Sequence, residues 1–463
     1  MAADVRTKRL ILFATSIGAV LSPLIGSMIV LAMPEIGVAF GVVARDLGWL
    51  STIFILVNAI FLIPASRLSD MMGYKRSYLL GAVIVGVACG LSVVAPTYGV
   101  LLVLRVVAAC GTSFLMVTGL AILSRVYPPR ERGAAFGVNA AMVHVGASAG
   151  PVLGGVLTDV FGWRSVFAVM VPMAVVAGVL MWWFFRDEVR FAGEGRFDVF
   201  GTVLYAAGMF CTMFGLSTLP SLVSAGLVVA GAVVMVVFVW YELRVLSPVL
   251  RVRLFFVNRR FARSAYAALL NYGCTAGSVF FVSLYLQSIG QLSPVHAGMV
   301  IFFRPLIQAV MAPVAGKVSD RMDPRYIVTG GMLLSMVGVL LLAGLGLETD
   351  LQYIMVAQVC IGLGSALFVA PNTNAIMGSV QASEFSAASG IVAVMRQAGM
   401  AISMAVCMSA ITIFEGGDDM LGPEMYPDFL EALQVSMVFC AGLAMVGVLF
   451  SWFRGDAAKE GGR

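Results

Sequence analysis

The sequence has 463 residues, of which 60% are hydrophobic and only 11% are charged, and its formal net charge is +5 at pH 7. Soluble globular chains are about 45–50% apolar and about 25% charged, so this composition excludes an ordinary soluble enzyme or binding protein. It predicts an all-α integral membrane protein, because apolar helices of about 20 residues can cross a lipid bilayer.

Fourteen apolar segments follow one another along the chain, separated by charged residues or by proline and glycine. The first six lie at 10–33, 47–66, 77–96, 98–124, 133–158 and 163–185. Two more, at 199–219 and 222–241, meet at Pro220, where the boundary between spans is hardest to place. The last six lie at 264–289, 295–316, 326–346, 351–377, 385–413 and 430–453. We therefore predict fourteen membrane-spanning helices.

The basic residues are distributed unevenly between alternate loops. If the N-terminus is cytoplasmic, most of the 29 lysines and arginines fall in cytoplasmic segments, and only Arg45 and Arg164 fall in outer loops. Cytoplasmic loops of membrane proteins carry such an excess of Lys and Arg. The distribution predicts a multi-pass protein of the cell (plasma or inner) membrane with both termini in the cytoplasm. One miscounted span would place the basic residues of all later inner loops outside, and the observed distribution shows no such inversion.

Weak matches between distant segments indicate an internal repeat. Residues 66–73 are similar to residues 316–323, at an offset of 250, and the pair Gly137 and Gly146 recurs at an offset of 253. Parallel repeats of this kind relate the two halves of many transporters. We predict three parts, a six-helix half at 1–190, an inserted helix pair at 191–250 and a second six-helix half at 251–463.

The fifth apolar segment carries a motif with the spacing G-x8-G-x3-GP-x2-GG. Glycines let a neighbouring helix approach closely, and a proline bends the helix, which suits a hinge or a seal. The chain resembles the fourteen-helix drug:proton antiporter branch of the major facilitator superfamily, where this motif marks exporters more than importers. Ordinary small-residue packing is the alternative. The matching residues are Gly137, Gly146, Gly150, Pro151, Gly154 and Gly155.

Two loops resemble the gating motif of the same family, G-x-L-x-D-R-x-G-R-[KR]. The resemblance implies that an aspartate closes one face of the protein through contacts with basic residues and with a helix N-terminus, whose partial positive charge favours an anion. The alternative is that the basic residues only anchor the loop in the cytoplasm. The gating residues are Asp70, Gly73, Lys75 and Arg76 in the first loop and Asp320 and Arg321 in the second.

Polar side chains inside the spans fall almost entirely in the segments that line the central cavity of this family. A charge at the bilayer centre costs about 2.5–3.5 kcal/mol on insertion scales, so such side chains usually face a cavity. Glu35 is the nearest acid, at the outer mouth. We predict a substrate and proton pathway that comprises Asn58, Arg105, His144, Asn271, Arg304, Gln308, Gln358, Asn372, Arg396 and Gln397.

His144 is the candidate proton carrier, because histidine is the only side chain whose unperturbed pKa lies near physiological pH. At the offset of 253 it corresponds to Gln397, next to Arg396, so the two sites are predicted to face each other. A neutral His144 that is hydrogen-bonded between helices is the alternative.

The expected function is proton-coupled export of small amphiphilic molecules by alternating access. Three arginines and no deep carboxylate in the spans predict an anionic, zwitterionic or neutral substrate. The alternatives are a facilitator or uptake carrier without proton coupling, or a non-transporting membrane receptor or scaffold that kept the fold. No motif indicates an enzyme, a metal, an organic cofactor or a nucleic-acid partner. We expect a monomer in membrane lipid that is driven by the proton gradient.

Overall fold

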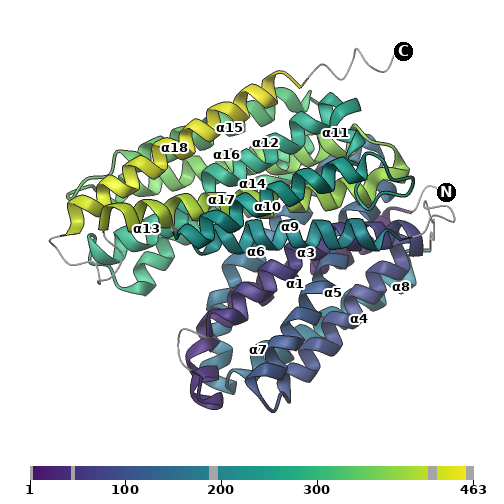
Figure 1. Ribbon diagram of the computed structural model, residues 1–463, viewed down its shortest axis with the longest axis horizontal. Coiled ribbons are helices and arrows are strands. Elements are labelled where there is room, and N and C mark those ends of the chain that lie inside the picture. The colour runs from purple at the N-terminus through teal and green to yellow at the C-terminus, as the bar shows by residue number, and fades with distance from the viewer. Residues whose placement is uncertain (1–3, 43–46, 187–196, 220, 416–424, 455–463) are drawn as a thin grey trace. The chain divides into compact units, whose positions relative to one another are not determined.

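The computed structural model consists of helices and connecting turns in the part of the chain that it describes, residues 4–42, 47–186, 197–219, 221–415 and 425–454 (Figure 1). The N-terminal helices are α1 (Val5–Phe40), α3 (Trp49–Met72), α4 (Tyr74–Val93), α5 (Tyr98–Val126), α6 (Pro129–Phe161), α7 (Arg164–Ala168) and α8 (Met170–Phe184). The inserted pair consists of α9 (Val199–Ser217) and α10 (Leu222–Glu242). The remaining helices are α11 (Arg253–Val257), α12 (Arg259–Thr275), α13 (Gly277–Ser288), α14 (Pro294–Ser319), α15 (Pro324–Ala343), α16 (Leu351–Gly378), α17 (Phe385–Glu415) and α18 (Tyr426–Trp452).

The number of spans agrees with the prediction. Fourteen helices of the described chain are long and apolar enough to cross a membrane, when α7 with α8 and α12 with α13 are each taken as one span. The uncertain pair around Pro220 is two helices. The fold class predicted from the composition and the apolar segments is therefore confirmed.

Two compact units make up the chain. The first contains residues 1–206, 238–251 and 380–394, and the second contains residues 207–237, 252–379 and 395–463. The predicted limits of the two halves, at residues 190 and 250, stay a prediction.

In the first unit, α1 packs against α5, α6 and α8, while α4 packs against α5 and α8. The contact between α4 and α5 depends on two glycines. A Cβ atom on Gly81 would lie 2.8 Å from the carbonyl oxygen of Gly111, which is closer than side chains tolerate. Small residues allow this approach of two helix backbones.

The second unit repeats this contact. There α15 packs against α16 and α18, and a Cβ atom on Gly331 would lie 2.7 Å from the carbonyl oxygen of Gly364. Gly331 follows Gly81 by 250 residues, and Gly364 follows Gly111 by 253. The internal repeat seen in the sequence is thus also present in the helix packing.

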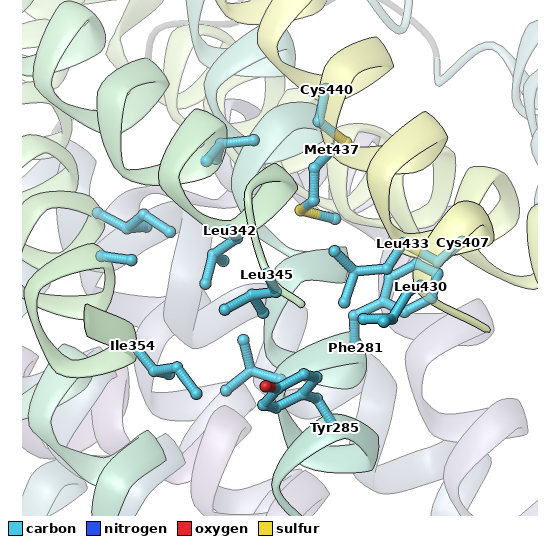
Figure 2. Packing of buried hydrophobic residues seen from close by; sticks show 14 of the residues in the cluster. Phe281, Tyr285, Leu342, Leu345, Ile354, Cys407, Leu430, Leu433, Met437 and Cys440 are labelled. Carbon is cyan, nitrogen blue, oxygen red and sulfur yellow. The ribbon is translucent and has the colours of Figure 1, made fainter. Parts of the chain in front are cut away.

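A cluster of buried apolar side chains joins α13, α15, α16 and α18 in the second unit (Figure 2). Phe281 of α13 packs on Phe429 of α18 with ring centroids 5.7 Å apart. The hydroxyl of Tyr285 donates to the carbonyl oxygen of Gly346 at 2.6 Å. These contacts hold α13, which follows a break in the ninth span, against its neighbours. All seven cysteines lie in the described chain and none forms a disulfide.

Candidate functional site

The glycine motif of α6 forms a tight seam with α1. A Cβ atom on Gly146 would lie 2.8 Å from the carbonyl oxygen of Val20, and one on Gly154 would lie 2.5 Å from that of Met28. A Cβ atom on Gly150 would overlap the side chain of Ser27. These three glycines therefore let the two helix backbones touch, as the motif predicted for a close-packed helix.

The other motif residues lie beside this seam. Gly137 is buried, and a Cβ atom on Gly155 would meet only the end of the flexible Leu31 side chain at 3.2 Å. Pro151 is exposed. The hydroxyl of Ser27 donates to the carbonyl oxygen of Pro23 at 2.8 Å, within α1.

Arg105 is buried between three helices of the first unit. Its Nε donates to the carbonyl oxygen of Leu50 at 3.0 Å, and its Nη1 donates to that of Ile25 at 3.4 Å. The guanidinium lies 4.5 Å from the centroid of the Phe54 ring. Only 1% of the residue is exposed. Arg105 thus joins α1, α3 and α5, and within the described chain it has no carboxylate partner.

Asn58 also links α3 to α5. Its amide Nδ2 donates to the hydroxyls of Thr112 at 2.9 Å and Ser113 at 3.1 Å. In return, the Ser113 hydroxyl donates to the main-chain carbonyl of Asn58 at 3.1 Å. Asn58 is therefore buried in the helix interface in this conformation.

Arg304 of α14 occupies the break between α12 and α13. Its Nη1 donates to the carbonyl oxygen of Thr275 and to the hydroxyl of Ser278, both at 2.9 Å. A helix break leaves carbonyls without their usual intrahelical donors, and a guanidinium can satisfy them. Arg304 stabilises this break from a neighbouring helix.

Four amides of the predicted pathway are buried in the second unit, namely Asn271, Gln308, Gln358 and Asn372. In the described chain, both polar atoms of the Asn271 amide and both of the Gln358 amide have no hydrogen-bond partner. Leaving a buried polar group unpaired costs about 1–3 kcal/mol. These groups are therefore suited to bind water or a polar part of a substrate.

Asn372 belongs to a network that the sequence did not reveal. Its Nδ2 donates to the carbonyl oxygen of Ser264 at 2.9 Å, and its Oδ1 accepts from Arg454 at 3.4 Å. Arg454 also donates to the carbonyl oxygen of Pro324 at 3.3 Å and to the hydroxyl of Ser451 at 3.2 Å. In the sequence, Arg454 is one of the basic residues that follow the last apolar segment, and this position is the only signal that it gives. The network ties α12, α15, α16 and α18 together.

His144, Arg396 and Gln397 are half-buried, unlike the other pathway residues. His144 lies in the first unit and the other two lie in the second, so their predicted meeting stays a prediction. Arg396 lies within electrostatic range of Tyr272 of α12. An aromatic residue in an apolar segment gives no polar signal, so the sequence analysis missed Tyr272. Glu35 is exposed near the end of α1.

The first gating loop lies between α3 and α4. Asp70 is 4% exposed, lies close to Ser386 and is within electrostatic range of Arg67 and Arg251. Its Oδ1 accepts a hydrogen bond from the hydroxyl of Tyr74 at 3.5 Å. Gly73 has a φ of +95°, which a residue with a side chain rarely adopts. Lys75 is half-buried and Arg76 is exposed.

Ser386 stands in the first turn of α17, and its hydroxyl donates to the carbonyl oxygen of Ser66 at 2.8 Å. Arg251, missed as a functional residue, pairs with Glu384 at 3.4 Å. We call Arg67, Asp70, Arg251, Glu384 and Ser386 the gate cluster.

The second gating loop follows α14 in the second unit. The Nδ2 of Asn374 donates to Oδ1 of Asp320 at 3.4 Å and to the hydroxyl of Ser319 at 3.2 Å. Arg321 is exposed. The aspartate of this loop is thus held by α16 of its own unit.

Three comparisons place the chain among known proteins. It is 30% identical to riboflavin transporter RibZ of Clostridioides difficile over 86% of this chain and 87% of the relative. It is 29% identical to multidrug resistance protein Stp of Mycobacterium tuberculosis over 88% of this chain and 76% of the relative. The structure superposes on the human organic anion transporter MFSD10 (TETRAN) with a TM-score of 0.67 and 14% identity, over 96% of this chain and 99% of that one.

The sequence pattern of one family covers most of the chain, at residues 15–241 and 264–463. Together with the fourteen spans, the repeated glycine contacts and the glycine seam of α6, this match settles the family. The chain is a multi-pass membrane transporter that belongs to the Major Facilitator Superfamily.

Proposed function

We propose that this transporter exports small amphiphilic molecules in exchange for protons, by alternating access across the cell membrane with both termini in the cytoplasm. The seam between α1 and α6 is the observation that carries the proposal. Gly146, Gly150 and Gly154 stand where any side chain would collide with α1. Their spacing is the motif that marks exporters more than importers in this family. The name of the relative Stp, a multidrug resistance protein, supports the same direction of transport.

The substrate is anionic, zwitterionic or neutral. Arg105 and Arg304 place two positive charges inside the spans, and within the described chain both have carbonyl, hydroxyl or aromatic partners rather than carboxylates. An uncompensated cation disfavours a second cation nearby and favours an anion. Arg396 adds a third positive charge, on a side chain that is only half-buried.

His144 carries the coupled proton. It lies in α6 next to the seam, and its side chain is half-buried, so it keeps some access to water. A coupling residue must exchange its proton with one side of the membrane at a time, and we assign this role to His144 because it lies beside the seam.

Transport into inverted membrane vesicles tests the direction and the coupling. Export from the cell corresponds to uptake by these vesicles, so an interior-acid pH gradient should drive uptake of an anionic or neutral amphiphile. A protonophore should abolish the uptake, and vesicles without the protein are the control. Uptake that is the same with and without the pH gradient would contradict proton coupling.

A second candidate function is transport of riboflavin, which the identity to the riboflavin transporter RibZ favours. We pair this candidate with a mechanism that does not use the proton gradient. The same vesicles separate the two. Riboflavin flux in either orientation that is unchanged by the pH gradient, with no flux of the amphiphile panel, would support the second candidate.

A further inference from the structure

The inserted helix pair brings two carboxylates together at one end. Asp198 directly precedes α9, and Glu242 is the last residue of α10. A Cβ atom on Gly201 would lie 2.5 Å from Oδ2 of Asp198 and 2.6 Å from Oε1 of Glu242. The two oxygens are therefore at most about 5 Å apart, which is within the range where one carboxylate disfavours ionisation of another.

Glu242 also holds the chain that follows the inserted pair. It is 4% exposed, and its two carboxylate oxygens accept the main-chain N–H groups of Val249 at 3.3 Å and Leu250 at 3.2 Å. Hydrogen bonds to an ionised carboxylate are roughly twice as strong as those to a neutral group. The position of residues 249–250 thus depends on the charge of Glu242.

The next residue is Arg251 of the gate cluster. Its Nη1 lies 3.4 Å from Oε1 of Glu384, just before α17, and it is within electrostatic range of Asp70. Glu242 therefore positions Arg251 through two main-chain hydrogen bonds.

Arg67 connects the same groups by charge. It is 8% exposed, and its Nε has no hydrogen-bond partner in the described chain. It is within electrostatic range of Asp70 and also of Glu242. Two carboxylates, one from the gating loop and one from the inserted pair, thus share one buried guanidinium.

We propose that Glu242 is a positioning residue of the gate cluster, and that a proton bound by the Glu242–Asp198 pair releases Arg251 and opens this cluster. The proton comes from water and adds to a carboxylate oxygen. Glu242 then loses its charge, and its hydrogen bonds from the main-chain N–H groups of residues 249 and 250 weaken. Arg67 then interacts with the charge of Asp70 alone. The inserted helix pair thereby acts as a proton-sensitive arm of the gate.

Other charged and titratable groups around Glu242 set the strength of this response. Tyr241 donates its hydroxyl to Oδ1 of Asp198 at 3.3 Å, and the N–H of Gly201 donates to the same oxygen at 2.9 Å. Each carboxylate of the pair thus accepts two hydrogen bonds, but Glu242 is 4% exposed whereas Asp198 is only half-buried. Burial penalises the charged form of a carboxylate, so Glu242 is the member of the pair that binds the proton. The groups that face Glu242 directly or through the gate cluster are Asp198, Tyr241, Arg67, Arg251, Asp70, Tyr74 and Glu384.

Amide hydrogen exchange of the purified full-length protein in nanodiscs tests the proposal without substrate. Exchange at Val249 and Leu250, corrected for its intrinsic pH dependence, should be slow at high pH and at least tenfold faster at low pH. In Glu242→Gln it should be fast at every pH. In Asp198→Asn the midpoint should move to lower pH, because the neighbouring negative charge is gone. Glu348→Gln, an exposed acid outside the gate cluster, is the matched control.

Two results would overturn the proposal. One is exchange at residues 249–250 that has the same pH dependence in the wild type and in Glu242→Gln. The other is a midpoint that does not move in Asp198→Asn, which retains every hydrogen bond of Glu242 and so guards against a folding defect in the first variant.

This inference rests on the proposed proton-coupled transport, but an experiment can contradict one of the two without contradicting the other. Suppose that amide exchange depends on pH, that Glu242→Gln abolishes this dependence, and that the protein moves no protons with substrate. These results would support the proton-sensitive arm and contradict proton-coupled transport. Substrate-driven proton movement together with exchange that Glu242→Gln leaves unchanged would contradict the proton-sensitive arm alone.

Discussion

Arg105 and Arg304 donate to the carbonyl oxygens of Ile25 and Thr275, two positions that are 250 residues apart and thus equivalent in the repeat. The arginines themselves come from different helices of their halves. At the same offset, Arg304 corresponds to Phe54, the ring that covers Arg105. Each half therefore holds its first span with a buried guanidinium, and the two halves supply it from non-equivalent positions.

Replacing either arginine by lysine should destabilise the protein. Lysine keeps the charge but lacks the planar fork that reaches two acceptors. Hydrogen bonds to charged groups contribute about 1.5–3 kcal/mol, so we expect Arg105→Lys and Arg304→Lys each to lower the melting temperature in detergent by several degrees. Unchanged melting would show that the carbonyl contacts do not matter. Arg259→Lys, at an exposed position, is the control.

A side chain on the seam of α6 should block transport. Gly154→Ala places a Cβ atom 2.5 Å from the Met28 carbonyl oxygen, and overpacking typically costs about 1–3 kcal/mol. We expect at least a tenfold loss of substrate flux with the protein still in the membrane. Gly26→Ala is the matched control, since nothing lies within 4 Å of its added atom. Equal flux in both variants would contradict a functional seam.

The Asn372–Arg454 contact should behave as one unit in stability measurements. Residues of one hydrogen-bond network show coupling energies of about 0.5–3 kcal/mol in double-mutant cycles. We expect the effects of Asn372→Ala and Arg454→Ala on thermal stability to be clearly less than additive when combined. Additive effects would show that Asn372 is not coupled to Arg454, and its role would then be the one predicted in the substrate pathway.

Arg396 should select substrates by charge. If it contacts the substrate, Arg396→Gln will raise the KM of an anionic compound several-fold and leave that of a neutral compound of similar size unchanged. Arg259→Gln, which removes an exposed charge, should change neither value. A parallel loss for both compounds would assign Arg396 a structural role instead.

The sequence predicted the features that depend on local patterns. Apolar runs and the positions of charges identified fourteen helices, and the spacing of Gly146, Gly150 and Gly154 identified the seam. The sequence did not predict which residues of distant helices contact one another. The partners of Arg105 are main-chain carbonyls, which every residue carries, so no pattern marks them. Likewise the approach of Asp198 to Glu242 depends on how the inserted pair closes, and the short motifs of the family do not include either residue.

Substrate-driven proton movement in proteoliposomes tests the central claim most directly. We predict that an anionic or neutral amphiphile moves protons through the wild-type protein, that His144→Gln abolishes this movement, and that His296→Gln, at the exposed start of α14, retains it. Substrate flux in the wild type without any proton movement would contradict the account.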